Sequence, residues 1–81
     1  MIAVGLWGSL RPFAGGADSV ELEAATIRDL LAALVAQHPG VEPFLKSGIA
    51  VSIDGVVYQN SPGQRIPAGV EVYLLPRLRG G

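Results

Sequence analysis

The chain has 81 residues, a net charge of −1 and no cysteine, and 49% of its residues are hydrophobic. This length predicts one domain, residues 1–81, and the lack of cysteine excludes disulfides, thiolate metal sites and a cysteine nucleophile. One histidine and six scattered basic residues provide neither a histidine metal cluster nor a basic patch for nucleic acid. We therefore expect no metal, no cofactor and no nucleic-acid partner.

The sequence also lacks the signals of a membrane protein and of a hydrolase. No apolar run approaches the ~20 residues that span a bilayer, and the N-terminus lacks the pattern of a signal peptide. We expect no membrane partner and a cytoplasmic location. His38 lies at the end of a helical pattern, where a structural role is expected, and no G-x-S-x-G motif supplies a nucleophile. We expect no catalytic residue.

The first 23 residues predict a β-hairpin. "MIAVGLWGSL" alternates, so that its even-numbered residues share one face and its odd-numbered residues, including Trp7, share the other. "RPFAGGA" contains turn residues, and "SVELE" alternates again. Two alternating strands around a glycine-rich loop are typical of a hairpin.

The next segment, "TIRDLLAALVAQHPG", predicts an α-helix over residues 27–38. Thr26 and Asp29 form a start that resembles a capping box, and Pro39 with Gly40 ends the pattern. Apolar residues recur at the spacing of one helix face. They are Ile27, Leu30, Leu31, Leu34 and Val35.

The second half of the chain predicts further strands. "VEPFLKSG" is interpreted as a connection whose Phe44 and Leu45 fill the core beneath it. Asp54-Gly55 between apolar runs indicates a tight hairpin turn. Residues 59–69 are irregular, and "VEVYLLP" predicts a final strand that Pro76 ends. One helix stripe must pack on one sheet face.

This order of elements predicts an α+β fold, the β-grasp or ubiquitin-like fold. Its mixed sheet has four or five strands, and the first strand pairs with the last at the centre. One main helix covers the even-numbered residues of both strands. The odd-numbered residues Trp7, Tyr73 and Leu75 then share the opposite face, and grouped exposed apolar residues usually mark a contact surface. The alternative is that the loop over 59–69 covers them.

Several motifs together resemble the MoaD/ThiS family of ubiquitin-like sulfur carriers, most closely the small subunit of molybdopterin synthase. They are "SLR" after the first strand, "T-x-R-D-L-L" at the helix start, and the final Gly80-Gly81. The resemblance covers the whole chain. It implies that residues 76–81 form a flexible C-terminal tail.

The resemblance also implies a function and two partner enzymes. An E1-like, ATP-dependent enzyme would adenylate the C-terminal carboxylate of Gly81, and a persulfide sulfur would then displace AMP to leave a thiocarboxylate. A sulfur-acceptor enzyme, such as the molybdopterin synthase large subunit, would use that sulfur. The chain itself would act as a protein co-substrate and not as an enzyme. Glycines at positions 80 and 81 suit this role because they can thread a narrow channel.

The tail also departs from the molybdopterin synthase branch. Arg77 and Arg79 in "LPRLRGG" resemble the tail of ubiquitin, and they either meet acidic residues of the activating enzyme or are solvated charges. A carrier for thiamin thiazole or another thio-metabolite, and a ubiquitin-like protein modifier, are the alternatives. A β-grasp binding module with an inert tail is a further one.

Overall fold

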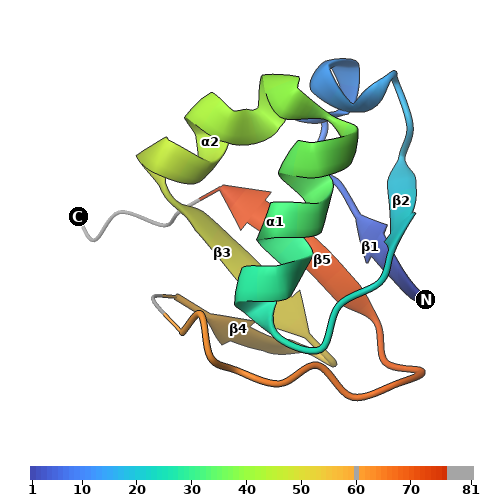
Figure 1. Ribbon diagram of the computed structural model, residues 1–81, viewed down its shortest axis with the longest axis vertical. Coiled ribbons are helices and arrows are strands. Elements are labelled where there is room, and N and C mark those ends of the chain that lie inside the picture. The colour runs from blue at the N-terminus through green and yellow to red at the C-terminus, as the bar shows by residue number, and fades with distance from the viewer. Residues whose placement is uncertain (60, 77–81) are drawn as a thin grey trace.

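The structure is a computed structural model that describes residues 1–59 and 61–76. A five-stranded mixed sheet has the order β2-β1-β5-β3-β4, with β5 parallel to β1 and every other neighbouring pair antiparallel. The predicted α+β β-grasp is confirmed, and its first and last strands pair at the centre (Figure 1). The elements are β1 (Ile2–Gly5), η1 (Arg11–Ala14), β2 (Ser19–Leu22), α1 (Ile27–Gln37), η2 (Pro39–Val41), α2 (Glu42–Ser47), β3 (Ile49–Ile53), β4 (Val56–Tyr58) and β5 (Val72–Pro76).

The main helix, α1, has the predicted ends. The Thr26 hydroxyl oxygen accepts a hydrogen bond from the Asp29 N–H at 3.3 Å, which caps the first turn. His38 is the C-terminal cap, and its N–H donates to the Leu34 carbonyl at 2.8 Å. The buried positions of α1 are Ile27, Leu30 and Leu34, while Leu31 and Val35 are half-buried at the margin of the stripe.

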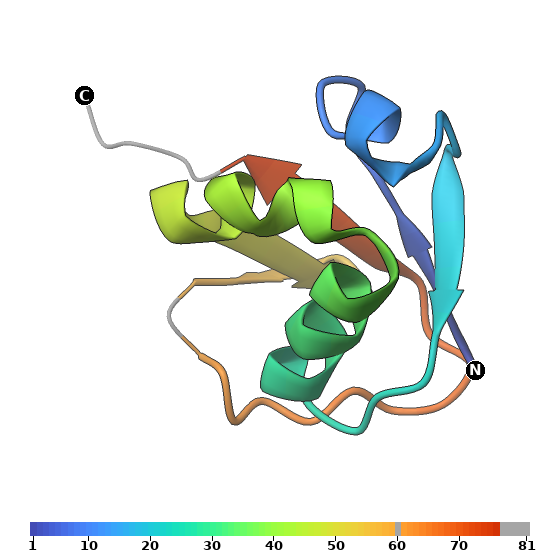
Figure 2. The ribbon, with the colours of Figure 1, turned by 45° about the horizontal axis from the view of Figure 1, so that its top comes forward.

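The hydrophobic core lies between α1 and one face of the sheet. The even-numbered residues of β1 and β5 line the core on the sheet side, as the alternation of these strands predicts. Val4 and Leu74 are at most 1% exposed. Both α1 and α2 lie on this face (Figure 2), so within residues 1–59 and 61–76 no helix covers the opposite face of the sheet. We call that uncovered side the open face. In the described part of the chain, no helix has the length and apolar character needed to cross a membrane.

The segment 41–48, which the sequence predicts as a connection, is largely helical. Val41 is the last residue of η2, and the next six residues form α2. Pro43 lies in the first turn of α2. The N–H groups of a first turn have no partner within the helix, so the N–H that proline lacks costs no hydrogen bond there. Lys46 and Glu42 form an i,i+4 ion pair at 3.7 Å. Val41 is the fully buried residue of this segment, whereas Phe44 is half-buried.

The second hairpin and the loop after it also take defined positions. Asp54 and Gly55 have φ values of 50° and 84°, the pair of positive angles that a type I′ turn requires. The loop then passes along the start of α1, where the Ile27 N–H donates to the Gln64 carbonyl at 3.0 Å and the Arg28 N–H to the Pro62 carbonyl at 2.9 Å. The loop therefore satisfies backbone donors at the beginning of α1.

Candidate functional site

Tyr73 lies on the open face at the centre of the sheet. In the register of β5, Tyr73 pairs with Gly5 of β1 on one side and with Ser52 of β3 on the other. Tyr73 is 48% exposed. Leu75, two residues further along the same strand, is half-buried and pairs with Ala50. Two of the three predicted contact residues therefore lie on one strand of the open face.

Gly5 is the residue that allows Tyr73 to lie across β1. A Cβ atom built on Gly5 would come within 2.6 Å of the Tyr73 Cε1 atom, which no real side chain tolerates. The phenol ring thus packs directly on the backbone of the neighbouring strand. A glycine inside a strand often marks such a close approach. A glycine within the first strand was visible in the sequence, but the sequence did not show that Tyr73 is the residue that packs on it.

We expect Gly5→Ala to displace the Tyr73 ring and to lower the free energy of unfolding by about 1 kcal/mol, because overpacking outweighs the gain in strand propensity. Gly8→Ala is the matched control, since the space around its Cβ position is empty within 4 Å. Chemical denaturation and the NMR signals of the Tyr73 ring measure the two effects. Unchanged ring signals in Gly5→Ala would contradict the close packing.

Trp7 occupies a different position from the predicted one. It was assigned to the first strand, but β1 ends at Gly5 and the Trp7 carbonyl begins a turn by accepting the Leu10 N–H at 3.0 Å. Because β1 and β5 are parallel and Gly5 pairs with Tyr73, Trp7 leaves the sheet near the level of Leu75. The three predicted contact residues thus lie toward the same end of the sheet.

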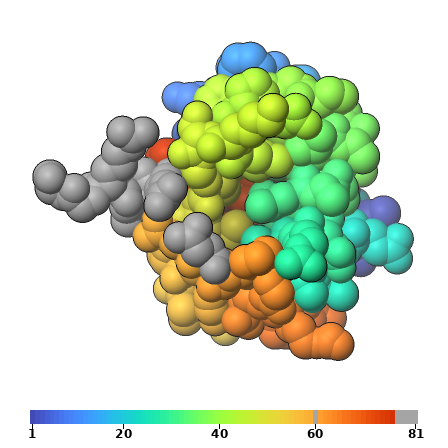
Figure 3. Space-filling model, turned by 60° about the vertical axis from the view of Figure 1, so that its left-hand side comes forward, coloured from blue at the N-terminus to red at the C-terminus, as the bar shows by residue number. Residues whose placement is uncertain are grey.

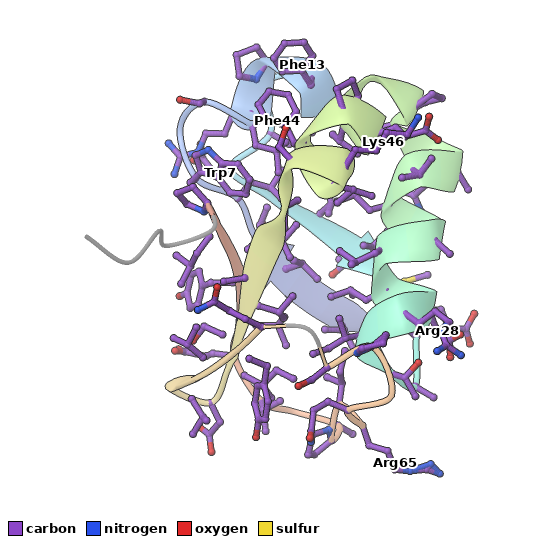
Figure 4. All side chains as sticks on the ribbon, turned by 90° about the vertical axis from the view of Figure 1, so that its left-hand side faces the viewer. Trp7, Phe13, Arg28, Phe44, Lys46 and Arg65 are labelled. Atoms are coloured by element: carbon purple, nitrogen blue, oxygen red, sulfur yellow. The ribbon has the colours of Figure 1, made fainter. Side chains whose placement is uncertain are left out.

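Trp7 belongs to an aromatic cluster that we define as Trp7, Phe44 and Phe13. The rings of Trp7 and Phe44 meet edge to face with centroids 6.1 Å apart, and Phe13 lies 4.9 Å from Phe44. Figure 4 shows the three rings along one end of the molecule. The ring that packs on Trp7 therefore comes from α2. The residues after β4, which were the alternative cover for Trp7, run instead along the start of α1. Trp7 is half-buried and Phe13 is 48% exposed.

The motif residues that suggested the family have structural roles in the described part of the chain. Arg11 donates from Nε to the Leu6 carbonyl at 3.1 Å and lies 3.5 Å from an Asp18 carboxylate oxygen, so that it joins η1 to the residue after β1 and to the residue before β2. Thr26 caps α1. These residues maintain the fold, so a contact site has to be sought elsewhere.

Four predicted site residues, Arg77, Arg79, Gly80 and Gly81, lie outside the described residues. The last described residue is Pro76, which was assigned to the tail but is the final residue of β5 and pairs with Ile49. Within residues 1–59 and 61–76, no group of three or more His, Cys, Asp or Glu side chains could hold a metal ion. The described part of the candidate site is the predicted contact surface of Trp7, Tyr73 and Leu75, and we call residues 77–81, which follow Pro76, the C-terminal segment.

This fold defines a class of protein, the ubiquitin-like proteins of the ThiS/MoaD type. The ThiS family model matches residues 4–81. The chain belongs to the ThiS family.

Solved structures resemble the chain over nearly its full length. Small archaeal modifier protein 1 from Haloferax volcanii is 27% identical with a TM-score of 0.74, and the match covers 99% of this chain and 98% of the other. A chain of the Amycolatopsis orientalis BexX/CysO complex is 22% identical with a TM-score of 0.81, and the match covers 100% of both chains. A protein described as molybdopterin converting factor, subunit 1, from Pyrococcus furiosus is 18% identical with a TM-score of 0.78, covering 95% and 97%. No curated protein sequence matches.

Proposed function

We propose that the chain is a sulfur carrier whose C-terminal carboxylate, on Gly81, is adenylated by an E1-like enzyme and converted to a thiocarboxylate. The observation that carries this proposal is the ThiS family match, which runs through Gly80 and Gly81. A carboxylate is a poor electrophile, and adenylation gives it a leaving group, AMP, that the terminal sulfur of a persulfide can displace to form an acyl disulfide. A thiol then attacks the outer sulfur of this acyl disulfide, releases the thiocarboxylate and is itself oxidised to a disulfide. The chain supplies the carboxylate, and the partner enzymes perform the chemistry.

We propose that the carried sulfur is used in molybdopterin biosynthesis. The acceptor of the sulfur would be the large subunit of molybdopterin synthase. The similarity to the Pyrococcus furiosus protein supports this assignment at the level of the fold. A ubiquitin-like modifier is the second candidate, because small archaeal modifier protein 1 is 27% identical over nearly the whole chain. Lys46 is the single lysine of the sequence, which disfavours extended chains of the protein on itself.

The partner-binding surface that we propose consists of Trp7, Tyr73 and Leu75, followed by Arg77 and Arg79. Aromatic residues are enriched at interface centres, and the first three lie toward the end of the sheet from which the C-terminal segment continues. Arginines beside the glycines would pair with carboxylates of the activating enzyme. A partner that receives Gly81 must approach this end.

Intact mass tests the proposal. Incubation with the cognate E1-like enzyme, ATP, a persulfide donor and a thiol reductant should add about 16 Da, because one carboxylate oxygen is replaced by sulfur. The same measurement verifies that Gly81 is the C-terminus of the mature chain. A large isopeptide-linked adduct in place of this shift would favour the modifier, and an unchanged mass would contradict both functions.

A further inference from the structure

An apolar groove of about 200 Å³ lies on the helix side of the sheet. Its walls come from α1, the end of α2, β3, β4 and the residues that follow β4. Figure 3 shows the hollow between the green α1, the yellow-green α2 and the orange loop. Leu31, Leu45 and Ile49 line it and are each half-buried, so apolar surface of these side chains remains accessible. Trp7, Tyr73 and Leu75, the described residues of the proposed partner surface, do not line this groove.

The groove begins beside the last residue of β5. Ile49, one of its walls, is the direct antiparallel partner of Pro76, and paired Cα atoms in such strands are about 5 Å apart. Gly48, the residue before Ile49, also lines the groove and has no side chain to obstruct a crossing. Two residues of extended chain reach about 7 Å. Residue 78 is therefore within reach of the groove.

The sequence of the C-terminal segment fits one apolar site. Its five residues are Arg-Leu-Arg-Gly-Gly, so Leu78 is its one large apolar side chain. In an extended chain, neighbouring side chains point to opposite sides. When Leu78 faces the protein, Arg77 and Arg79 face the solvent, and neither charge has to be buried.

We propose that this groove is a docking site for the chain's own C-terminal segment, with the Leu78 side chain inserted between Leu31, Leu45 and Ile49. A segment joined to the chain beside the groove has an effective concentration in the millimolar range, which favours it over a second copy or a free ligand of equal intrinsic affinity. The docked segment holds Gly80 and Gly81 against the carrier. A consequence for sulfur loading, namely that a partner must first release the segment, rests on the proposed function; the docking itself does not.

Methyl NMR spectra of the full chain test the docking. We compare it with a chain that stops at Pro76, with Leu78→Ser, and with Arg79→Gln as a control that keeps the apolar side chain. Leu78→Ser should shift the methyl signals of Leu31, Leu45 and Ile49 to their positions in the shortened chain, and Arg79→Gln should leave them unchanged. The methyl signals of Val57, which lies on β4 and does not line the groove, are the internal reference. Identical groove signals in all four chains would overturn the proposal.

A spin label distinguishes the chain's own segment from that of a second copy. The chain has no cysteine, so Gly81→Cys gives a single attachment point. The label should broaden the Leu31 and Leu45 signals, and the additional change Leu78→Ser should remove the broadening. Broadening that appears only when labelled chains are mixed with separate isotope-labelled chains would overturn the proposal in favour of a dimer.

The two proposals fail separately. If the carrier is adenylated but Leu78→Ser leaves the groove signals unchanged, the docking is wrong and the carrier function stands. If the groove signals respond to Leu78→Ser and no thiocarboxylate forms with the cognate enzyme, the docking stands and the carrier function is wrong.

Discussion

Removal of Gly81 should lower adenylation by the cognate E1-like enzyme by at least about a hundredfold. The shortened chain ends in a carboxylate on Gly80, about 3.5 Å short of the position that Gly81 reaches. Misplacement of a reacting group by even about 1 Å can cost a hundredfold in rate. ATP–pyrophosphate exchange measures this step directly.

The controls for this result keep the fold constant. One residue added after Gly81 should also abolish exchange, because the reacting carbonyl then lies within a peptide bond. Thermal stability should be the same for the native, shortened and extended chains, since β5 and the core end at or before Pro76. If the shortened chain is adenylated as fast as the native one, the carrier function is wrong, and the binding module with an inert tail replaces it.

Trp7→Ala should weaken binding to the activating enzyme by roughly thirtyfold. An aromatic residue buried at the centre of an interface typically contributes about 2 kcal/mol or more, and about 1.4 kcal/mol corresponds to a factor of ten in Kd. Trp7 is half-buried in the free chain, so a partner can still bury part of the indole. Isothermal titration calorimetry gives the affinity.

Because the indole also contacts Phe44 in α2, Trp7→Ala removes a contact of the fold as well. Tyr73→Ala is the companion variant, since Tyr73 is 48% exposed and its loss disturbs the core less. Val56→Ala, in the edge strand β4, is the control for a generic exposed apolar residue, with 53% exposure. Native affinity in both Trp7→Ala and Tyr73→Ala, with normal circular dichroism, would rule out this surface.

Local sequence pattern was sufficient for most of the fold. The apolar spacing from Ile27 to Val35 predicted the helix and its buried side. Asp54-Gly55 predicted a turn whose two positive φ values few residue pairs adopt. Alternation in the first and last strands determined which of their residues enter the core. In each case the information lies within a few residues of the chain.

The features that the sequence did not predict depend on contacts between distant residues. Trp7 packs against Phe44, which lies 37 positions away in the sequence. Strand alternation predicts the face on which Trp7 lies, but it does not predict which ring packs against it. The short helix α2 has too few turns to give a clear period, and its position depends on the burial of Val41. The groove exists only after α1, α2 and β3 have packed together.

The central position of β5 has a mechanical consequence. A partner that draws the C-terminal segment into a channel pulls on Pro76 along the axis of β5. That strand is held by β1 on one side and by five paired residues of β3 on the other, so the load acts in shear on two hydrogen-bonded ladders together. An edge strand such as β4, with one neighbour, would transmit the same tension to a single ladder. The sheet order thus distributes tension on the C-terminal end of β5 over two neighbouring strands.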